Sequence, residues 1–220
     1  MRGLFITFEG VEGAGKTTQL TKLAKTLRRL GLHLKTFREP GGTPIAEGIR
    51  AIFLDPALSP SPLTEALLLE AARSDLVNKE IIPALEAGAV VLCDRYTDST
   101  LAYQGAGRGF NSSDLRVLNR VATSRLVPDM TILLDLDPLK GLSRKFASAE
   151  GVHRLEYEAL EFHKRVAACF RRLARADSIR FRRFDADLPT AEISVLIEEA
   201  VLARYGRRLT KLGKGPQPRA

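Results

Sequence analysis

The residues with the clearest chemical potential lie in a glycine-rich loop near the start of the chain. Residues 10–18 read GVEGAGKTT, which has the spacing G-x-x-x-x-G-K-T. The glycines let backbone N–H groups approach phosphate oxygens, while Lys16 would reach the outer phosphates and the Thr17 hydroxyl would ligate Mg²⁺. We therefore predict a site for a nucleoside triphosphate with magnesium. The predicted set is Gly10, Glu12, Gly13, Ala14, Gly15, Lys16, Thr17 and Thr18.

The segments on either side of this loop distinguish a phosphate site from an ordinary glycine turn with a chance lysine. Residues 4–9 (LFITFE) form an apolar and aromatic run typical of a strand, and residues 17–30 carry leucines at the helical period. A helix that begins here points the positive end of its dipole at bound phosphates. Because the motif requires a strand before it and a helix after it, we favour the phosphate site.

A second predicted strand, residues 34–38, is followed by Glu39, Pro40 and two glycines. In open α/β sheets, ligands bind outside the carboxyl ends of the strands. Glu39 and Pro40 are therefore well placed to contact a second substrate. A plain Pro-Gly-Gly turn is the alternative.

A third predicted strand, residues 89–93, is unbroken and apolar, and it ends in Asp94 and Arg95. A carboxylate and a guanidinium at this end suggest a division of roles, with Asp94 near Mg²⁺ and Arg95 on a phosphate. The segment that follows carries polar groups that suit a base and a sugar, namely Ser99, Thr100, Tyr103 and Gln104. An ordinary helix with a surface tyrosine is the alternative for this segment.

Two arginines lie on predicted helices. Arg50 belongs to a short helix at residues 44–54, and Arg73 belongs to a long helix at residues 63–86 with a kink at Pro83. An arginine on a mostly buried helix is costly unless it is paired or faces a cleft. Arg73 is therefore a candidate site residue.

Basic residues also flank a glycine-broken segment at residues 144–156. Arg144, Lys145 and Arg154 lie at its two ends. This arrangement predicts a flexible lid that closes on phosphates, although a solvated loop explains the charges equally well.

The order of elements predicts the fold class. Strands at 4–9, 34–38, 89–93, 130–136 and 179–184 are separated by helical segments. Alternating strands and helices form parallel βαβ units. We predict a three-layer α/β fold of the P-loop NTPase type, in which a five-stranded parallel sheet is flanked by helices on both faces. A single domain would span residues 1–205, with a last helix at 189–204 and a disordered basic tail at 206–220.

Composition narrows the class of protein further. Hydrophobic residues make up 45% and charged residues 27% of the chain, as in ordinary globular proteins. The chain lacks a long apolar run and has no room for a leader before the first strand, so we expect no membrane partner and a cytoplasmic location. Cys93 and Cys169 are expected to be reduced, and no zinc site is expected.

The net charge of +8 raises the alternative of a nucleic-acid surface. Much of the excess lies in residues 171–183 and in the tail, and no basic stripe with interleaved aromatics is present. A cleft that holds several phosphates also needs positive charge. We therefore expect no nucleic-acid partner.

Several segments together resemble one family. FEGVEGAGKTTQ, REPGGT, AAR, DRYTDSTLAYQG and RLE are similar to segments of the bacterial thymidylate kinases, which are P-loop nucleoside-monophosphate kinases. The resemblance implies transfer of the γ-phosphoryl group of ATP to dTMP, with Mg²⁺ as cofactor and a homodimeric assembly. It implies catalytic roles for Lys16, Arg95, Arg154 and Arg144, and metal binding by Thr17 and Asp94. The substrate-binding residues that it implies, together with the preceding patterns, are Glu12, Glu39, Pro40, Arg50, Leu69, Arg73, Arg95, Ser99, Thr100, Tyr103 and Gln104.

Three positions depart from the family pattern. Leu69 stands where the family usually has an aromatic that stacks on thymine, and the neighbouring Glu70 is unusual. Gly13 stands where some members carry an arginine, so we expect the catalytic cation to come from the lid, first from Arg154 and second from Arg144. Leu69 favours one competing hypothesis, a kinase for another monophosphate. A P-loop switch that hydrolyses nucleotide without an acceptor is a further alternative.

Overall fold

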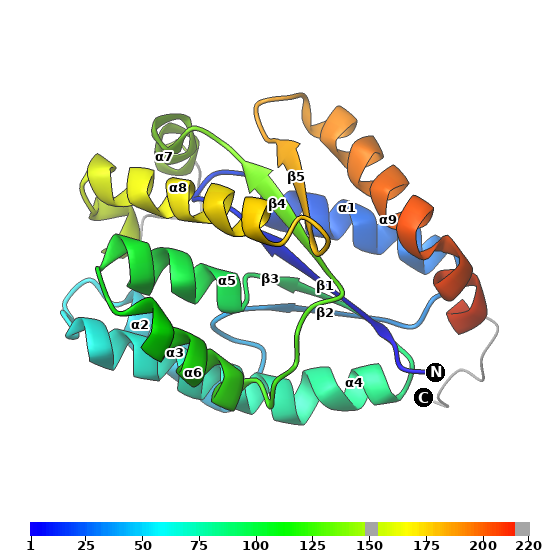
Figure 1. Cartoon of the computed structure of the whole chain (residues 1–220), viewed down its shortest axis with the longest axis horizontal. Helices are drawn as coiled ribbons and strands as arrows, with labels where there is room; N and C mark the ends of the chain where they lie inside the picture. The colour runs from blue at the N-terminus through cyan, green and yellow to red at the C-terminus, as the bar shows by residue number, and fades with distance from the viewer. Residues whose placement is uncertain (148–153, 214–220) are drawn as a thin grey trace.

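The centre of the molecule is a five-stranded parallel sheet, shown in Figure 1 by a computed structural model that describes residues 1–147 and 154–213. The strands have the spatial order β2-β3-β1-β4-β5. In chain order they are β1 (Leu4–Glu9), β2 (Leu34–Arg38), β3 (Val90–Asp94), β4 (Met130–Asp135) and β5 (Phe181–Asp185).

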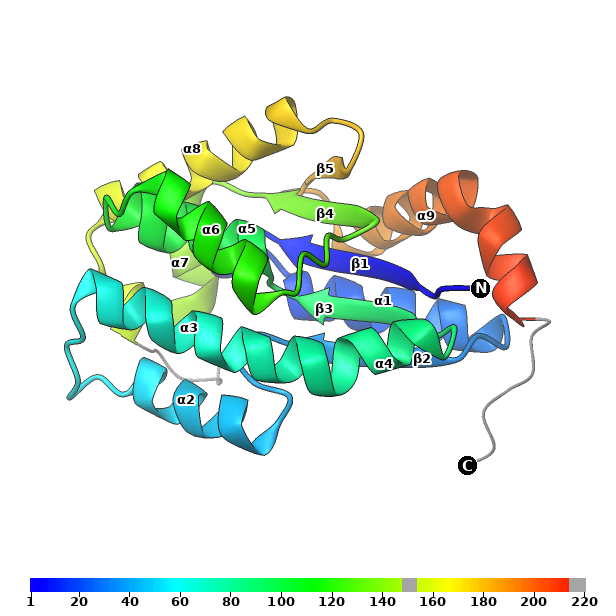
Figure 2. The same cartoon turned by 60° about the horizontal axis from the view of Figure 1, so that its bottom comes forward.

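Helices cover both faces of this sheet, which confirms the predicted three-layer α/β class. Helices α1 and α9 pack against one face, and α4 and α8 pack against the other (Figures 1 and 2). The α-helices are α1 (Lys16–Arg29), α2 (Pro44–Leu54), α3 (Pro62–Leu76), α4 (Ile82–Glu86), α5 (Thr97–Thr100), α6 (Ser112–Ala122), α7 (Pro138–Phe146), α8 (Leu160–Ala176) and α9 (Thr190–Gly213). Two π-helical segments, η1 (Val77–Ile81) and η2 (Leu101–Gly107), and a 3₁₀ segment, η3 (Arg154–Tyr157), complete the described elements.

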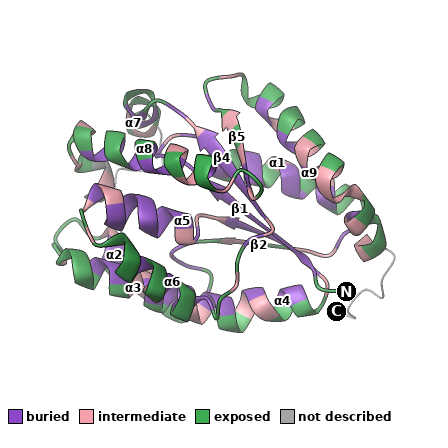
Figure 3. Cartoon of the chain, viewed as in Figure 1, coloured by how far each residue is buried: buried purple, intermediate pink, exposed green. Residues whose placement is uncertain are grey.

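The central strands are buried on both sides, as Figure 3 shows in purple. Successive side chains of a strand point to opposite faces, so a strand between two helical layers must be apolar throughout. In β1, Leu4 and Ile6 belong to the cluster that includes residues of α1 and α9. Phe5 instead packs with Val91 and Cys93 of β3 and with residues of α3 and α4.

The strand register brings the functional segments to one edge. Phe8 of β1 is paired in register with Asp94, and Arg38 of β2 is paired with Asp94 from the other side. The loops that follow β1, β2 and β3 therefore leave the sheet next to one another. This edge is the carboxyl side of parallel strands, where open α/β sheets bind ligands.

The predicted kink near Pro83 is present as a change of helix type. The helix expected over residues 63–86 is α3, then the π-helical turn η1, then α4. The Ile82 N–H donates to the Val77 carbonyl, five residues back. Proline lacks an N–H and so cannot continue the regular ladder, and the wider turn takes up the mismatch.

The predicted end of the last helix was wrong. The tail was expected to be disordered from residue 206, but α9 continues to Gly213. The Tyr205 hydroxyl donates to the Asp129 carbonyl at 2.7 Å, Arg208 pairs with the Asp129 carboxylate at 3.0 Å, and Leu209 is buried. Apolar residues thus continue at the helical period into the segment whose polar composition suggested a disordered tail. Residues 214–220 lie outside the described part of the chain.

In the described ranges, no helix is both long and apolar enough to cross a membrane.

Candidate active site

The loop between β1 and α1 has a backbone that requires glycine. Gly10 and Gly13 have φ values of 143° and 67°. A Cβ atom on Gly10 would lie 2.4 Å from the Leu134 carbonyl oxygen, and one on Gly13 would lie 2.1 Å from the Gly141 carbonyl oxygen. Because the backbone of α7 fills the space beside Gly13, that position has no room for a basic side chain.

Lys16 is buried at the N-terminus of α1. Its ammonium group donates to the carbonyl oxygens of Gly10 and Val11 at 3.0 and 2.8 Å, so the loop itself holds the charge beside the cleft. Burial, helped by the charge of Arg95, lowers the pKa of Lys16 to about 8, and nearby carboxylates oppose this shift. Bound phosphates would favour the charged form.

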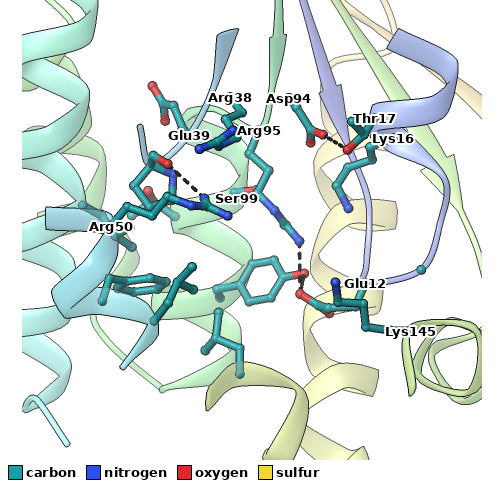
Figure 4. A pocket seen from close by; sticks show the side chains of 18 of the residues that line it. Glu12, Lys16, Thr17, Arg38, Glu39, Arg50, Asp94, Arg95, Ser99 and Lys145 are labelled. Carbon is teal, nitrogen blue, oxygen red and sulfur yellow. Dashed lines mark hydrogen bonds and ion pairs between the residues drawn. The ribbon is translucent and has the colours of Figure 1, made fainter. Parts of the chain in front are cut away.

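Thr17 and Asp94 form an oxygen pair at the same edge of the sheet. The Thr17 hydroxyl donates to the Asp94 carboxylate at 2.6 Å (Figure 4). Oxygen-only ligands suit Mg²⁺, which uses few protein ligands and is completed by water and phosphate. Across the described residues, no group of three or more His, Cys, Asp or Glu side chains could hold a metal ion. The Thr17–Asp94 pair supplies oxygen atoms of the kind that suit a metal accompanying a nucleotide.

Arg95 leaves β3 in an unusual conformation that a buried carboxylate supports. Its φ is 71°, a strained value for a residue with a side chain. Glu9 accepts hydrogen bonds from the Tyr96 N–H at 2.8 Å and from the N–H and hydroxyl of Ser99 at 3.2 and 2.6 Å. Burial and the neighbouring Asp98 raise the pKa of Glu9 to about 8. Sequence reasoning missed Glu9, although an acidic residue at the end of a buried strand was a signal.

Three side chains from separate elements contact the carboxylate of Glu12. The Tyr103 hydroxyl donates to its Oε1 at 2.6 Å and Arg95 donates to the same atom at 3.1 Å, while His163 Nδ1 of α8 lies 3.4 Å from Oε2. Burial works to raise the pKa of Glu12, but His163, Arg95 and Lys16 together hold it well below its ordinary value. His163 was not predicted as a site residue, because its contact with the loop depends on the tertiary fold.

Arg73 is both paired and at the wall of the cleft. Its Nε donates to Glu39 at 2.8 Å, its Nη1 donates to Glu70 and Thr100 at 2.5 and 2.8 Å, and it also contacts Asn119 and the Tyr96 carbonyl. These acceptors occupy the donors of a guanidinium, which has five N–H groups. Burial raises the pKa of Glu39 to about 7 even though Arg73 opposes that shift.

One cleft of about 600 Å³ collects the predicted residues (Figure 4). Arg50 points into it from α2 and donates to the Pro40 carbonyl at 3.0 Å. Gly10 and Ala14 do not line the cleft, because they form the buried underside of the loop. The predicted residues that line it are Glu12, Gly13, Gly15, Lys16, Thr17, Thr18, Glu39, Pro40, Arg50, Leu69, Arg73, Asp94, Arg95, Ser99, Thr100, Tyr103, Gln104 and Arg144.

The cleft also contains apolar residues that the sequence did not single out. Phe53, Leu54 and Leu155 line it together with Leu69. Phe53 lies on α2 and is only 4% exposed, and it is an aromatic residue among those that line the cleft. Its apolar position in a short helix gave no sign of this role.

The basic residues of the predicted lid differ in what can be described. Arg144 lies on α7, lines the cleft, and donates to the Ala186 carbonyl at 3.0 Å and to Asp187 at 3.2 Å. The backbone of Arg154 belongs to η3, but its side chain lies outside the described part of the chain, as do residues 148–153.

A phosphate loop after β1, an ionisable lysine beneath it and a continuous cleft toward β3 define a P-loop nucleotide-binding enzyme of the α/β class. Comparison with known proteins narrows this class. The family model described as thymidylate kinase matches residues 8–197. Among curated relatives, the thymidylate kinase of Thermomicrobium roseum is 52% identical over 207 residues, which covers 93% of this chain and 98% of the relative.

Two further relatives agree. The thymidylate kinase of Deinococcus radiodurans is 49% identical, with 92% of this chain and 98% of the relative covered. That of Pelobacter propionicus is 47% identical, with 91% and 94% covered. The chain belongs to the thymidylate kinase family. This membership confirms the family and the kinase activity predicted from the sequence motifs.

Proposed function

We propose that this chain transfers the γ-phosphoryl group of ATP to dTMP, giving dTDP and ADP, with Mg²⁺ bound alongside ATP. The observation that carries the proposal is that the phosphate loop and the segment after β3 line one cleft. A donor held at Lys16 and an acceptor held at Arg95 would therefore meet inside it. Membership of the thymidylate kinase family supports the same reaction.

The donor side of the cleft is the loop from Gly10 to Thr18 with the N-terminus of α1. Backbone N–H groups and Lys16 would hold the phosphates of ATP. Thr17 and Asp94 would hold Mg²⁺, since their oxygens lie 2.6 Å apart at this point. Bound there, the ion would neutralise charge on the phosphate oxygens.

The acceptor side is built around Arg95. Its guanidinium lies over the Tyr103 ring, 4.9 Å from the centroid, and is fixed by Glu12 and Ser99. We propose that Arg95 binds the dTMP phosphate with help from Arg50, and that Glu12 and Tyr103 contact the sugar. The base would lie against the wall that contains Glu39, Pro40, Leu69, Arg73, Thr100 and Gln104.

The reaction needs positioning more than proton transfer. The acceptor phosphate, with a second pKa near 6, is already ionised at neutral pH, so no general base is required. In-line placement and cationic stabilisation of the transferring group supply the rate. Lys16 and Arg144 are the described residues proposed to provide that charge, and Arg154 remains a prediction. The proposed domain extends to Gly213, where α9 ends. The predicted lid at 144–156 includes residues 148–153, which lie outside the described part of the chain.

A kinase for another monophosphate is the second candidate, because Leu69 lacks an aromatic ring. Phe53 lines the same cleft and brings an aromatic ring to it, but a ring of this kind packs on any base and does not select dTMP.

Two substitutions separate the halves of the cleft. Lys16→Ala should abolish most turnover with the fold retained, whereas Arg95→Ala should mainly raise KM for dTMP and leave KM for ATP within a few-fold. Steady-state kinetics with each substrate varied in turn, and circular dichroism for the fold, measure both. An Arg95→Ala effect confined to ATP would contradict the assignment.

We also propose a homodimer through α3 and α6, on the face that Figure 2 brings forward. Leu63 and Leu67 of α3 are 48% and 47% exposed, and Val117 and Val121 of α6 are 49% and 73% exposed. Exposed apolar side chains on two helices that pack together favour an interface over open solvent. Light scattering should find a dimer that Val121→Asp dissociates. The control Ile179→Asp, at a position that is 77% exposed near β5, should remain dimeric.

We propose a cytoplasmic location. Both cysteines are buried and unpaired, as in proteins of a reducing compartment.

A further inference from the structure

Helix α7 meets the phosphate loop through two glycines. Gly141 is buried on α7, and a Cβ atom there would lie 2.3 Å from the Glu12 carbonyl oxygen. A Cβ atom on Gly13 would lie 2.1 Å from the Gly141 carbonyl oxygen. The backbones of the two segments are therefore in contact, and each side of the contact excludes a side chain.

Side chains of α7 are also tied to the loop after β5. Lys140 forms an ion pair with Asp187, and Arg144 donates to the Ala186 carbonyl at 3.0 Å and to Asp187 at 3.2 Å. Asp137 caps the start of the helix by accepting from the Leu139 N–H at 3.0 Å. The helix is thus held between the phosphate loop and the β5 loop.

Arg144 and Lys145 follow Gly141 by one turn of α7 and line the cleft. Figure 4 shows Lys145 close to Glu12, where α7 approaches the phosphate loop. Because a helix is rigid over one turn, the separation at Gly141 fixes how far these two cations lie from the phosphate site.

From this geometry we infer that Gly141 is a positioning residue for phosphoryl transfer: its contact with Glu12 and Gly13 seats α7 and sets the position of Arg144 in the cleft. This inference rests on the proposed function, in which Arg144 stabilises the transferring group. It adds a residue that has no chemical group of its own.

A methyl group at Gly141 has a defined consequence. Ordinary contact begins near 3.4 Å, so the Cβ at 2.3 Å requires a shift of about 1 Å between α7 and the loop. The ion pairs between α7 and the β5 loop are about half exposed and weak, so α7 would give way. Alanine favours a helix over glycine, which offsets their loss. A misplacement of about 1 Å in a catalytic arrangement costs on the order of 10²-fold in rate.

The test uses Gly141→Ala, Arg144→Ala and the double variant. Gly206→Ala is the matched control, because Gly206 is also helical but its added Cβ would meet nothing within 4 Å. We expect Gly141→Ala to lower kcat about 10²-fold at saturating ATP and dTMP, with the melting temperature unchanged or raised. Gly206→Ala should keep the wild-type kcat. If Gly141 acts through Arg144, the double variant should be little worse than the more damaged single variant.

Wild-type kcat in Gly141→Ala would overturn the inference, as would a fall in melting temperature that accounts for the lost activity. Losses that multiply in the double variant would also overturn it. Wild-type kcat in Arg144→Ala would contradict the proposed role of Arg144. It would also contradict the positioning role of Gly141, which acts through Arg144. If Arg144→Ala loses activity but Gly141→Ala keeps full activity, the positioning role of Gly141 is overturned and the role of Arg144 stands.

Discussion

The buried carboxyl group of Glu9 offers a test of how the fold positions the acceptor site. Glu9 has no exposed surface, and it accepts from the Tyr96 N–H, the Ser99 N–H and the Ser99 hydroxyl. These bonds hold the turn in which Arg95 has a φ of 71°. Such a conformation costs about 1–3 kcal/mol and persists only where its surroundings impose it.

Replacing Glu9 by alanine leaves these three donors without their acceptor. At about 1 kcal/mol for each bond, the free energy of unfolding should fall by about 3 kcal/mol. Relaxation of Arg95 should raise KM for dTMP by about 10- to 100-fold, which corresponds to about 1.4–2.8 kcal/mol. Glu9→Gln retains an acceptor for both N–H groups, so its KM should stay within a few-fold of the wild type.

The pH dependence of stability gives an independent sign. Burial and Asp98 raise the pKa of Glu9 to about 8 in the folded state, so the folded protein binds more protons than the unfolded chain from about pH 4.5 to 8. The contribution of Glu9 to stability is therefore greatest at low pH and is lost as pH rises through this window. Glu9→Gln lacks that contribution and should gain stability relative to the wild type toward pH 8.

Urea unfolding across this pH range and dTMP kinetics at fixed ATP measure these effects. A wild-type KM for dTMP in Glu9→Ala would refute the support of Arg95 by Glu9. A Glu9→Gln variant as impaired as Glu9→Ala would refute the hydrogen-bond argument.

Three further predictions concern the same cleft. Because burial lowers the pKa of Lys16 to about 8, the ATP affinity of the wild type should weaken as pH rises above 8. The ATP affinity of Lys16→Arg should not change with pH over the same range. Calorimetric titration from pH 7 to 9.5 checks this, and the same pH dependence in both proteins would contradict it. His163→Phe should lower kcat/KM for dTMP about tenfold, since Glu12 Oε2 loses its described neighbour at 3.4 Å, and His163→Gln should recover part of the loss; equal rates for all three proteins would count against a role for His163. Tyr103→Phe removes the 2.6 Å bond to Glu12 and should raise KM for dTMP about tenfold with little change in KM for ATP. Steady-state kinetics with each substrate varied in turn check this, and a change confined to KM for ATP would contradict it.

Local patterns were sufficient to predict the sheet and the phosphate loop. The strands at Leu4–Glu9 and Leu34–Arg38 have the predicted bounds. An apolar run that ends before Gly10 marks the first strand, and the second lies between Gly31 and the Pro-Gly-Gly turn that begins at Pro40. The loop from Gly10 to Thr18 could be read for the same reason, since its function depends on spacing within nine residues. The residues predicted at the ends of β2 and β3 line one cleft, because parallel strands share a carboxyl edge.

The contacts that sequence reasoning missed are all long-range. Glu9 reaches Ser99, and His163 reaches Glu12 from α8, and in each pair the two residues lie far apart in the sequence. Phe53 has the pattern of an ordinary core residue in α2. Helix α9 extends past residue 206 because Arg208 finds Asp129, a partner distant in the sequence. Composition alone therefore suggested a tail where tertiary contacts extend a helix.

The central claim is that one cleft holds both ATP and dTMP. The most direct test is ADP release from ATP and Mg²⁺, measured in parallel with dTMP, dUMP, dGMP, CMP and no acceptor. The proposed arrangement predicts ADP release that depends on dTMP above the other acceptors and that is close to background without one. Release that ignores the acceptor, or that prefers a different monophosphate, would contradict it.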